Sequence, residues 1–103
     1  EDMHLRALRE EEVESMRLMQ STQSALNTDA DLLSQEEFDL IAQKMSALAS
    51  AVQAHDLDAM KALQKELAQA TETFAERRMD RAIQQALSGK SLDEIEEGSK
   101  DNA

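Results

Sequence analysis

The sequence predicts an all-α protein: an antiparallel three-helix bundle followed by one or two short helices, with a long first helix projecting beyond the bundle. Two observations lead to this fold class. The 103-residue chain has no Pro, only two Gly, and two Phe as its only aromatic residues, a composition that favours helix over strand. Apolar residues also recur at spacings of three and four, which places them on one face of a helix.

The segment 34–54 has the clearest helical pattern. Its apolar residues form one stripe, at Phe38, Ile41, Met45, Leu48 and Val52. Ser34 and Glu37 have the spacing of a capping box, and Leu33 can pack against Phe38 as a hydrophobic staple. We therefore expect this helix to begin at Ser34 and to lie at the centre of the bundle.

Residues 1–27 predict a longer first helix with a weaker apolar stripe, interrupted by acidic residues at Glu10, Glu11, Glu12 and Glu14. If this helix packs antiparallel to 34–54 through the short link 28–33, its partner ends before it does. Its first residues would then project, leaving Met3, Leu5 and Leu8 without a partner on this chain. The pattern equally allows these three side chains to meet the third helix or a neighbouring molecule.

A third helix is predicted at 57–75, with Asp56 as its N-cap. Its apolar stripe consists of Met60, Leu63, Leu67, Ala70 and Phe74. Thr71, Thr73 and the pair Arg77 and Arg78 suggest a break near 75–78.

A fourth helix is predicted at 77–88 and ends at Gly89, which suits a left-handed C-terminal cap. Ser91 and Glu94 have the spacing of a second capping box over a short turn. Residues 1–95 would then form one helical subdomain, and 96–103 a flexible acidic tail.

Charge and composition narrow the possible partners. Lys and Arg number 11 against 22 Asp and Glu, a formal net charge of −11, so we expect no nucleic-acid binding. The chain has no apolar run long enough to span a bilayer and no signal-peptide pattern, so no membrane association is expected. The absence of Cys fits a reducing compartment, and we expect a cytoplasmic location. Because the first residue is Glu rather than Met, we also expect a piece of a longer protein.

The residues show no catalytic constellation, so we expect no enzyme activity and no catalytic, cofactor-binding or metal-binding residues. His4 and His55 are far apart in sequence and lack a surrounding motif. Gly-rich phosphate loops and the Glu-x-x-His pairs of bundle metal sites are also missing. His55 is expected to have a surface or capping role at a helix junction.

Two further groups of residues are expected to be structural. Four methionines are placed on apolar stripes and predicted to fill the core: Met16, Met45, Met60 and Met79. The basic residues Arg77, Arg78 and Arg81 are expected to pair with Glu76, Asp80 or the acidic tail, in preference to an anionic ligand.

The run FAERRMDRAIQQALSGKSLDEI at 74–95, preceded by DLLSQEE at 31–37, resembles the C-terminal end of the HscA family, the DnaK-type (seventy-kilodalton heat-shock) chaperones of bacterial iron-sulfur cluster assembly. The resemblance implies that the chain is the helical lid of a substrate-binding region. Met3, Leu5 and Leu8 become candidate lid contacts from the projecting geometry together with the family. General DnaK-type lids carry an Asp and a His as an ionic latch where this chain has Met16 and Gln20, so closure is expected to be weaker and less sensitive to salt.

The same resemblance implies the partners. These are a β-sandwich peptide-binding subdomain of the same parent chain, an iron-sulfur scaffold protein as client, and a J-domain co-chaperone acting through the parent, whose ATPase domain would bind ATP. Without the resemblance, a second interpretation remains open: an autonomous acidic helical-bundle adaptor that binds an amphipathic partner helix in a groove.

Overall fold

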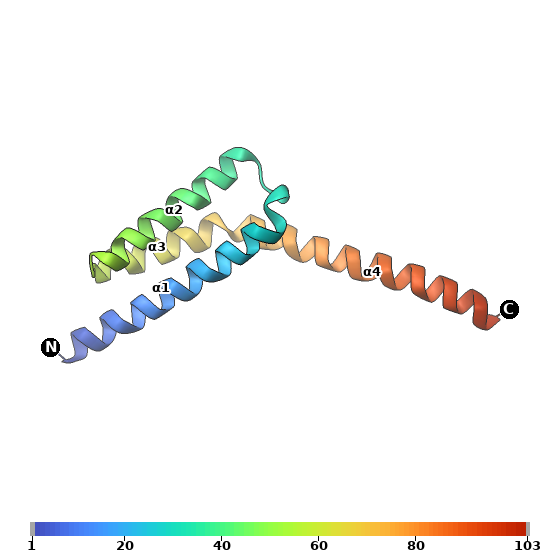
Figure 1. Ribbon diagram of the computed structural model, residues 1–103, viewed down its shortest axis with the longest axis horizontal. Coiled ribbons are helices and arrows are strands. Elements are labelled where there is room, and N and C mark those ends of the chain that lie inside the picture. Colours follow the sequence, from blue (N-terminus) through green and yellow to red (C-terminus); the bar gives the residue numbers. More distant parts are fainter. Residues whose placement is uncertain (1, 103) are drawn as a thin grey trace.

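The computed structural model describes the backbone of residues 2–102 and the side chains of residues 2–88. Its elements are α1 (Asp2–Asp29), the 3-10 helix η1 (Ala30–Leu32), α2 (Gln35–Gln53), α3 (Leu57–Ala70) and α4 (Glu72–Asn102), with no strand among the described residues. As Figure 1 shows, α2 runs back antiparallel to α1, α3 returns antiparallel to α2, and α4 continues away from the other three. The predicted all-α fold is confirmed.

The start of α2 is built as its sequence predicts. The Glu37 backbone N–H donates to Ser34 Oγ at 3.2 Å, and the Ser34 backbone N–H donates to Glu37 Oε1 at 2.8 Å, which completes the capping box. Leu33 and Phe38 both pack against the core. At α3, Asp56 accepts from the Ala59 backbone N–H at 3.1 Å. Since each cap needs only residues within four positions, short sequence motifs are enough to place both helix starts.

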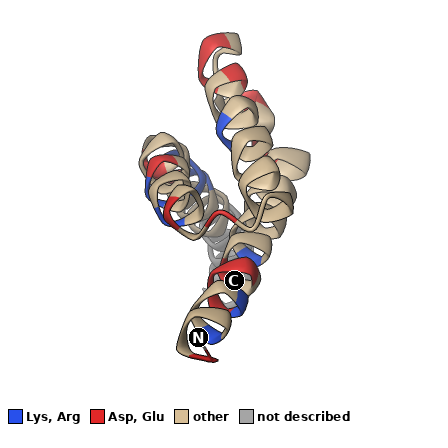
Figure 2. Ribbon diagram, turned by 90° about the vertical axis from the view of Figure 1, so that its left-hand side faces the viewer, with Lys and Arg blue, Asp and Glu red and all other residues tan. Residues whose placement is uncertain are grey.

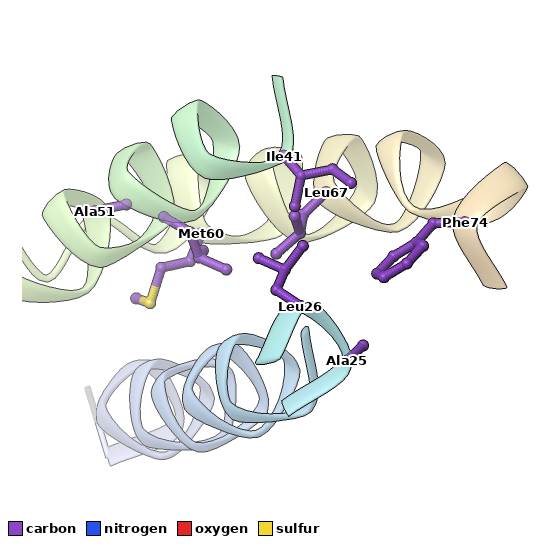
Figure 3. Close-up of a cluster of buried hydrophobic side chains, with 8 residues drawn as sticks. Ala25, Leu26, Ile41, Ala51, Met60, Leu67 and Phe74 are labelled. Carbon is purple, nitrogen blue, oxygen red and sulfur yellow. The ribbon is translucent and has the colours of Figure 1, made fainter. Parts of the chain in front are cut away.

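The core lies where α1, α2 and α3 meet, and it includes the first turn of α4. Its buried apolar residues are Ala25, Leu26, Ile41, Leu48, Ala51, Met60, Leu67 and Phe74. In Figure 3, Leu26 of α1 points toward Ile41 and Leu67. The stripes predicted for the second and third helices are therefore the ones that the fold buries.

The third helix ends earlier than predicted. α3 stops at Ala70 and α4 starts at Glu72, so the break is at Thr71 and not at 75–78. The Thr71 hydroxyl donates to the carbonyl oxygens of Leu67 (3.0 Å) and Ala68 (3.1 Å). A threonine that bonds to the backbone of the preceding turn competes with regular helix, which accounts for the break at this residue.

The fourth helix is much longer than predicted. α4 has 31 residues and exceeds the 28 of α1, where the sequence predicted a helix at 77–88, a Gly89 cap, a turn at Ser91 and a flexible tail at 96–103. The helix passes through Gly89, and no glycine among the described residues has a positive φ. One glycine inside a helix costs only about 1 kcal/mol relative to alanine, so good helix formers on either side can carry the helix through it.

Ion pairs join the start of α4 to the end of α1 and to η1. Arg78 Nε donates to Asp29 Oδ2 at 2.9 Å, and Arg81 bonds to both Asp29 (3.2 Å) and Asp31. The hydrogen bond from Arg81 lowers the pKa of Asp31. Ion pairing within the chain was predicted correctly, but among the described side chains the partners are these distant residues and not Glu76 or Asp80. The tail, the third predicted partner, lies outside the described side chains.

Arg77 adds a further link to this group of contacts. It donates to Glu37 Oε1 and to the Leu32 carbonyl oxygen, each at 2.8 Å. The same carboxylate therefore caps α2 and anchors α4, so these contacts set the direction in which α4 leaves the bundle.

Candidate functional site

The N-terminal end of α1 stands apart from the rest of the chain. In Figure 1 it lies away from the turn that joins α2 and α3, and residues 2–6 are all exposed. The first cross-helix packing along α1 occurs at Leu8, which contacts the core cluster. The projecting segment is therefore about two turns long, and it ends at Leu8.

The three candidate lid contacts fall into different environments. Met3 is 82% exposed and Leu5 is 46% exposed, as the projecting geometry predicts. Leu8 is half-buried and packs against the core, so the expectation that it has no partner on this chain is wrong. Leu8 lies on the side of α1 that faces the bundle. The buried Ser15 lies on the same side, seven residues and therefore about two helical turns further along the helix.

Polar contacts mark the point where α1 leaves its neighbours. His55 Nδ1 lies 2.8 Å from Glu12 Oε1, and His55 itself has a φ of 53° in the turn between α2 and α3. Gln64 of α3 donates to Ser15 Oγ at 2.9 Å and to Glu11 Oε1 at 3.0 Å. These bonds hold α1 in register against the bundle just behind its projecting end, and they give His55 a role at the helix junction.

The side of α1 that faces away from the bundle is the second part of the site. Successive residues turn by about 100° around a helix, so the side opposite the buried Ser15, Thr22 and Leu26 can be assigned directly. We call it the outward face, and all of its residues are exposed. It consists of Asp2, Arg6, Arg9, Glu10, Val13, Arg17 and Gln20, with Leu5 and Met16 at one edge.

Sequence reasoning missed most of this face. Met16 was predicted to fill the core, yet it is 53% exposed, and its neighbour Val13 is also exposed. Met79 on α4 was likewise predicted to be buried and is 65% exposed, whereas Met60 is buried and Met45 packs against the core. No clear signal in the sequence could have shown this, because α1 carries apolar residues on more than one side.

The outward face contains two shallow hollows. One is lined by Asp2, Leu5, Arg6, Arg9 and Glu10, and the other by Val13, Met16, Arg17 and Gln20. Seen from the end of the bundle, α1 carries blue Lys or Arg positions as well as red Asp and Glu positions (Figure 2). The surface is therefore apolar and charged at once, which suits contact with another protein surface.

A furrow lies on another side of the molecule, between the C-terminal half of α1 and the start of α4. Leu18, Thr22 and Ala25 line it from α1, and Phe74 and Ala75 from α4. It continues toward Met79 and Ala82. An amphipathic helix could lie in such a furrow, so it is the natural place for the adaptor interpretation.

Metal and membrane features were also sought in the part of the chain that the structure describes. There, no group of three or more His, Asp or Glu side chains is arranged to hold a metal ion. None of the helices in that part has both the length and the apolar character needed to cross a bilayer.

Comparisons with known proteins point to one group of chaperones. No protein-family model matches the chain. It is 50% identical over 94 residues to the chaperone protein HscA homolog of Janthinobacterium sp. (strain Marseille), and 51% identical over 94 residues to that of Herminiimonas arsenicoxydans. It is 46% identical over 95 residues to the chaperone protein HscA of Xenorhabdus nematophila.

These matches cover 91 or 92% of this chain, and the chain spans about 15% of the length of each of the three relatives. The matched part is their C-terminal segment. The chain is thus a homologue of the C-terminal segment of the HscA chaperones.

Proposed function

We propose that this chain is the helical lid of a chaperone and closes over peptide held by a β-sandwich subdomain of the same parent chain. The single observation that carries the proposal is the projecting end of α1, which presents Met3 and Leu5 to solvent beyond the bundle. Homology to the C-terminal segment of HscA chaperones supports it. The lid would act mechanically, with no bond made or broken by its own residues.

The bundle suits this task because its core is tightly packed, whereas the N-terminal end of α1 is free to contact another surface. Ile41, Leu48 and Leu67 are fully buried, and the Gln64 bonds to Ser15 and Glu11 fix α1 against α3. A docking force applied to the free end of α1 would therefore move the bundle as one body. Apolar side chains at that end would lose contact with water when the lid closes, which favours the closed state.

The wider role follows the same homology. We propose that the parent chain works in the cytoplasm in iron-sulfur cluster assembly, with the cluster scaffold protein as client. Its ATPase domain would bind ATP and be stimulated by a J-domain co-chaperone. None of these partners needs a cofactor bound by the present chain.

The test is the rate at which labelled peptide leaves a parent chain that contains both the β-sandwich and this lid. Leu5→Asp should accelerate release about tenfold, because a charge replaces apolar surface that the closed lid buries. Leu40→Asp is the matched control, since Leu40 on α2 is 44% exposed against 46% for Leu5. Equal release rates for the two variants would remove the projecting end from the mechanism.

The adaptor interpretation is favoured by one observation, the furrow between α1 and α4. It makes a different forecast in the same experiment. Leu5→Asp would leave peptide release unchanged, while Ala75→Glu, at a position that lines the furrow, would abolish binding of an amphipathic helical peptide to this chain.

A further inference from the structure

Beyond its first turns, α4 carries an exposed apolar stripe. Met79, Ile83 and Leu87 recur every four residues and are between 49% and 65% exposed, and Ala82 and Ala86 lie on the same side of the helix. We call these five residues the α4 stripe. Figure 1 shows α4 continuing away from the other three helices. Since a helix in a protein gains most of its stability from packing of its apolar face, a partner on the α4 stripe would stabilise α4.

The α4 stripe is continuous with the furrow between α1 and α4. Met79 and Ala82 belong to both, and Ala75 of α4 and Thr28 of α1 line the furrow beside them. This outer part of the furrow has a volume of about 510 Å³. A second helix lying on the α4 stripe could therefore place an apolar side chain in the furrow.

This region carries little charge, although the chain as a whole has a net charge of −11. Only three stretches of eight or more residues lack Asp, Glu, Lys and Arg, and these are 18–28, 45–55 and 82–89. The first supplies the α1 side of the furrow, and the last contains most of the α4 stripe. The charged residues that line the furrow bond to one another, Arg78 and Arg81 both pairing with Asp29. The matching partner surface is therefore apolar and uncharged.

Two carboxylates limit how a partner helix can lie on α4. Glu76 and Asp80 are exposed on the stripe side or at its edge, in the turns just before Ile83. A partner helix meets the least repulsion if its own contacting residues are uncharged, as 82–89 of this chain are. The chain thus carries the surface that suits its own stripe.

We propose that the α4 stripe is a self-association surface, on which two copies of this chain pair antiparallel about a two-fold axis. Met79 of one copy lies against Leu87 of the other, and Ile83 lies near the axis. One apolar patch serves both copies in such a symmetric pair. Antiparallel pairing also keeps the two acidic bundles at opposite ends, whereas parallel pairing would bring them side by side. The N-terminal end of α1 stays free in both copies, so the proposal does not depend on the lid function.

Sedimentation equilibrium of this chain tests the proposal. Because the α4 stripe is short, the pair buries less surface than a standard interface, and we expect a Kd of about 10 to 100 µM. The mass should rise from 11.5 kDa toward twice that value when the concentration is raised from about 5 to about 500 µM. A mass that stays at one chain over this range would overturn the proposal.

Salt should strengthen this association. Two copies of net charge −11 repel each other, and raising NaCl from about 0.05 M to about 0.5 M screens that repulsion while apolar contacts remain. Dissociation at high salt would overturn the proposal, because ion pairs would then hold the two copies together.

Ile83→Asp should abolish the association, because it places a charge near the two-fold axis. Val13→Asp is the matched control, since Val13 on α1 is 55% exposed against 49% for Ile83 and the added charge is the same. Circular dichroism of each variant shows whether the helices remain. Equal loss of association in the two variants would overturn the proposal, because the effect would then come from net charge alone.

Cysteine cross-linking tests the antiparallel arrangement without adding charge. The chain has no Cys, so a single introduced thiol reports one position. Under mild oxidation, a mixture of Met79→Cys and Leu87→Cys chains should form the mixed disulfide dimer faster than either chain links to itself, and mass spectrometry distinguishes the products. Faster linking of Met79→Cys to itself would overturn the antiparallel pairing.

The same measurements separate a second copy from another partner. If the chain remains monomeric but binds an amphipathic helical peptide, and Ala75→Glu removes that binding, the furrow takes a helix of another protein. This result would overturn the choice of a second copy, and it would leave the Leu5→Asp test of the lid function unaffected.

Discussion

At the scale of single residues, neighbouring positions on α2 have opposite roles. Ile41 is fully buried between α1 and α3, whereas Leu40 beside it is 44% exposed. Ile41→Ala should lower the free energy of unfolding by about 2 to 5 kcal/mol, because it removes buried apolar surface and leaves a cavity. Leu40→Ala should cost less than about 1 kcal/mol. Urea denaturation of the two variants measures both values, and similar losses would contradict the assigned core.

Glu37 should make stability depend on pH. The Arg77 side chain, together with the Ser34 backbone N–H, lowers the pKa of Glu37 to about 2. Since the pKa in the folded state lies below that in the unfolded state, the ionised carboxylate stabilises the fold above about pH 5. This contribution is lost as pH falls toward 2.

The Glu37→Gln variant should therefore lose less of its thermal stability than the unmodified chain when pH is lowered from about 6 to about 2. The melting temperature followed by circular dichroism measures this. Glu36→Gln, at the exposed neighbouring position, is the control and should keep the full pH dependence. An unchanged pH dependence in Glu37→Gln would mean that the contact with Arg77 does not form in solution.

At the scale of elements, the direction of α4 depends on a few polar contacts. Thr71 interrupts the helix, and Arg78 and Arg81 then tie the first turns of α4 to Asp29 and Asp31. Apart from Phe74, the larger apolar residues of these turns are partly or mostly exposed. The placement of α4 therefore rests on these ion pairs together with the packing of Phe74 in the core.

Arg81→Gln should loosen the start of α4 without unfolding the bundle. Amide hydrogen exchange should become faster at 72–82, since breaking the contacts with Asp29 and Asp31 frees these turns to open locally. Exchange in α2 should stay unchanged. Lys61→Gln on α3 is the control, and equal exchange in the two variants would show that the ion pairs do not hold α4.

The elements also show how far sequence patterns reach. The start of α2 at Gln35 and that of α3 at Leu57 were predictable, because Ser34, Glu37 and Asp56 bond to backbone groups three residues away. The end of α3 was not, because Thr71 and the Arg77 and Arg78 pair are equally good local signals for a break. The length of α4 was also missed, since Gly89 is compatible with both a cap and a helix interior.

At the scale of the whole molecule, the chain is elongated. Its radius of gyration is 19.7 Å and its extents are 72 × 33 × 17 Å, whereas a compact domain of this length has a radius of gyration of about 13 Å. The elongation comes from the two ends, where α1 projects on one side of the bundle and α4 on the other (Figure 1). The lid function proposed above would use the free end of α1.

The candidate site was only partly predictable from the sequence, because its exposure depends on how the helices of the whole molecule pack together. The greater length of α1 relative to α2 could be estimated by counting residues, and this was enough to expect Met3 and Leu5 in solvent. Val13 and Met16 could not be assigned, because α1 carries apolar residues on two sides. Only the position of α3, through Gln64 and Ser15, decides which side is covered.

The sequence by itself determined the helical class, the starts of α2 and α3 and the stripes buried in the core, because capping and helical periodicity act over a few residues. Only the tertiary structure decided that Leu8 is covered while Met16 and Met79 are exposed, and that Arg81 pairs with Asp29, 52 residues away. Such contacts depend on how whole helices lie against one another. A pattern of a few neighbouring residues cannot predict which residues far apart in sequence will meet.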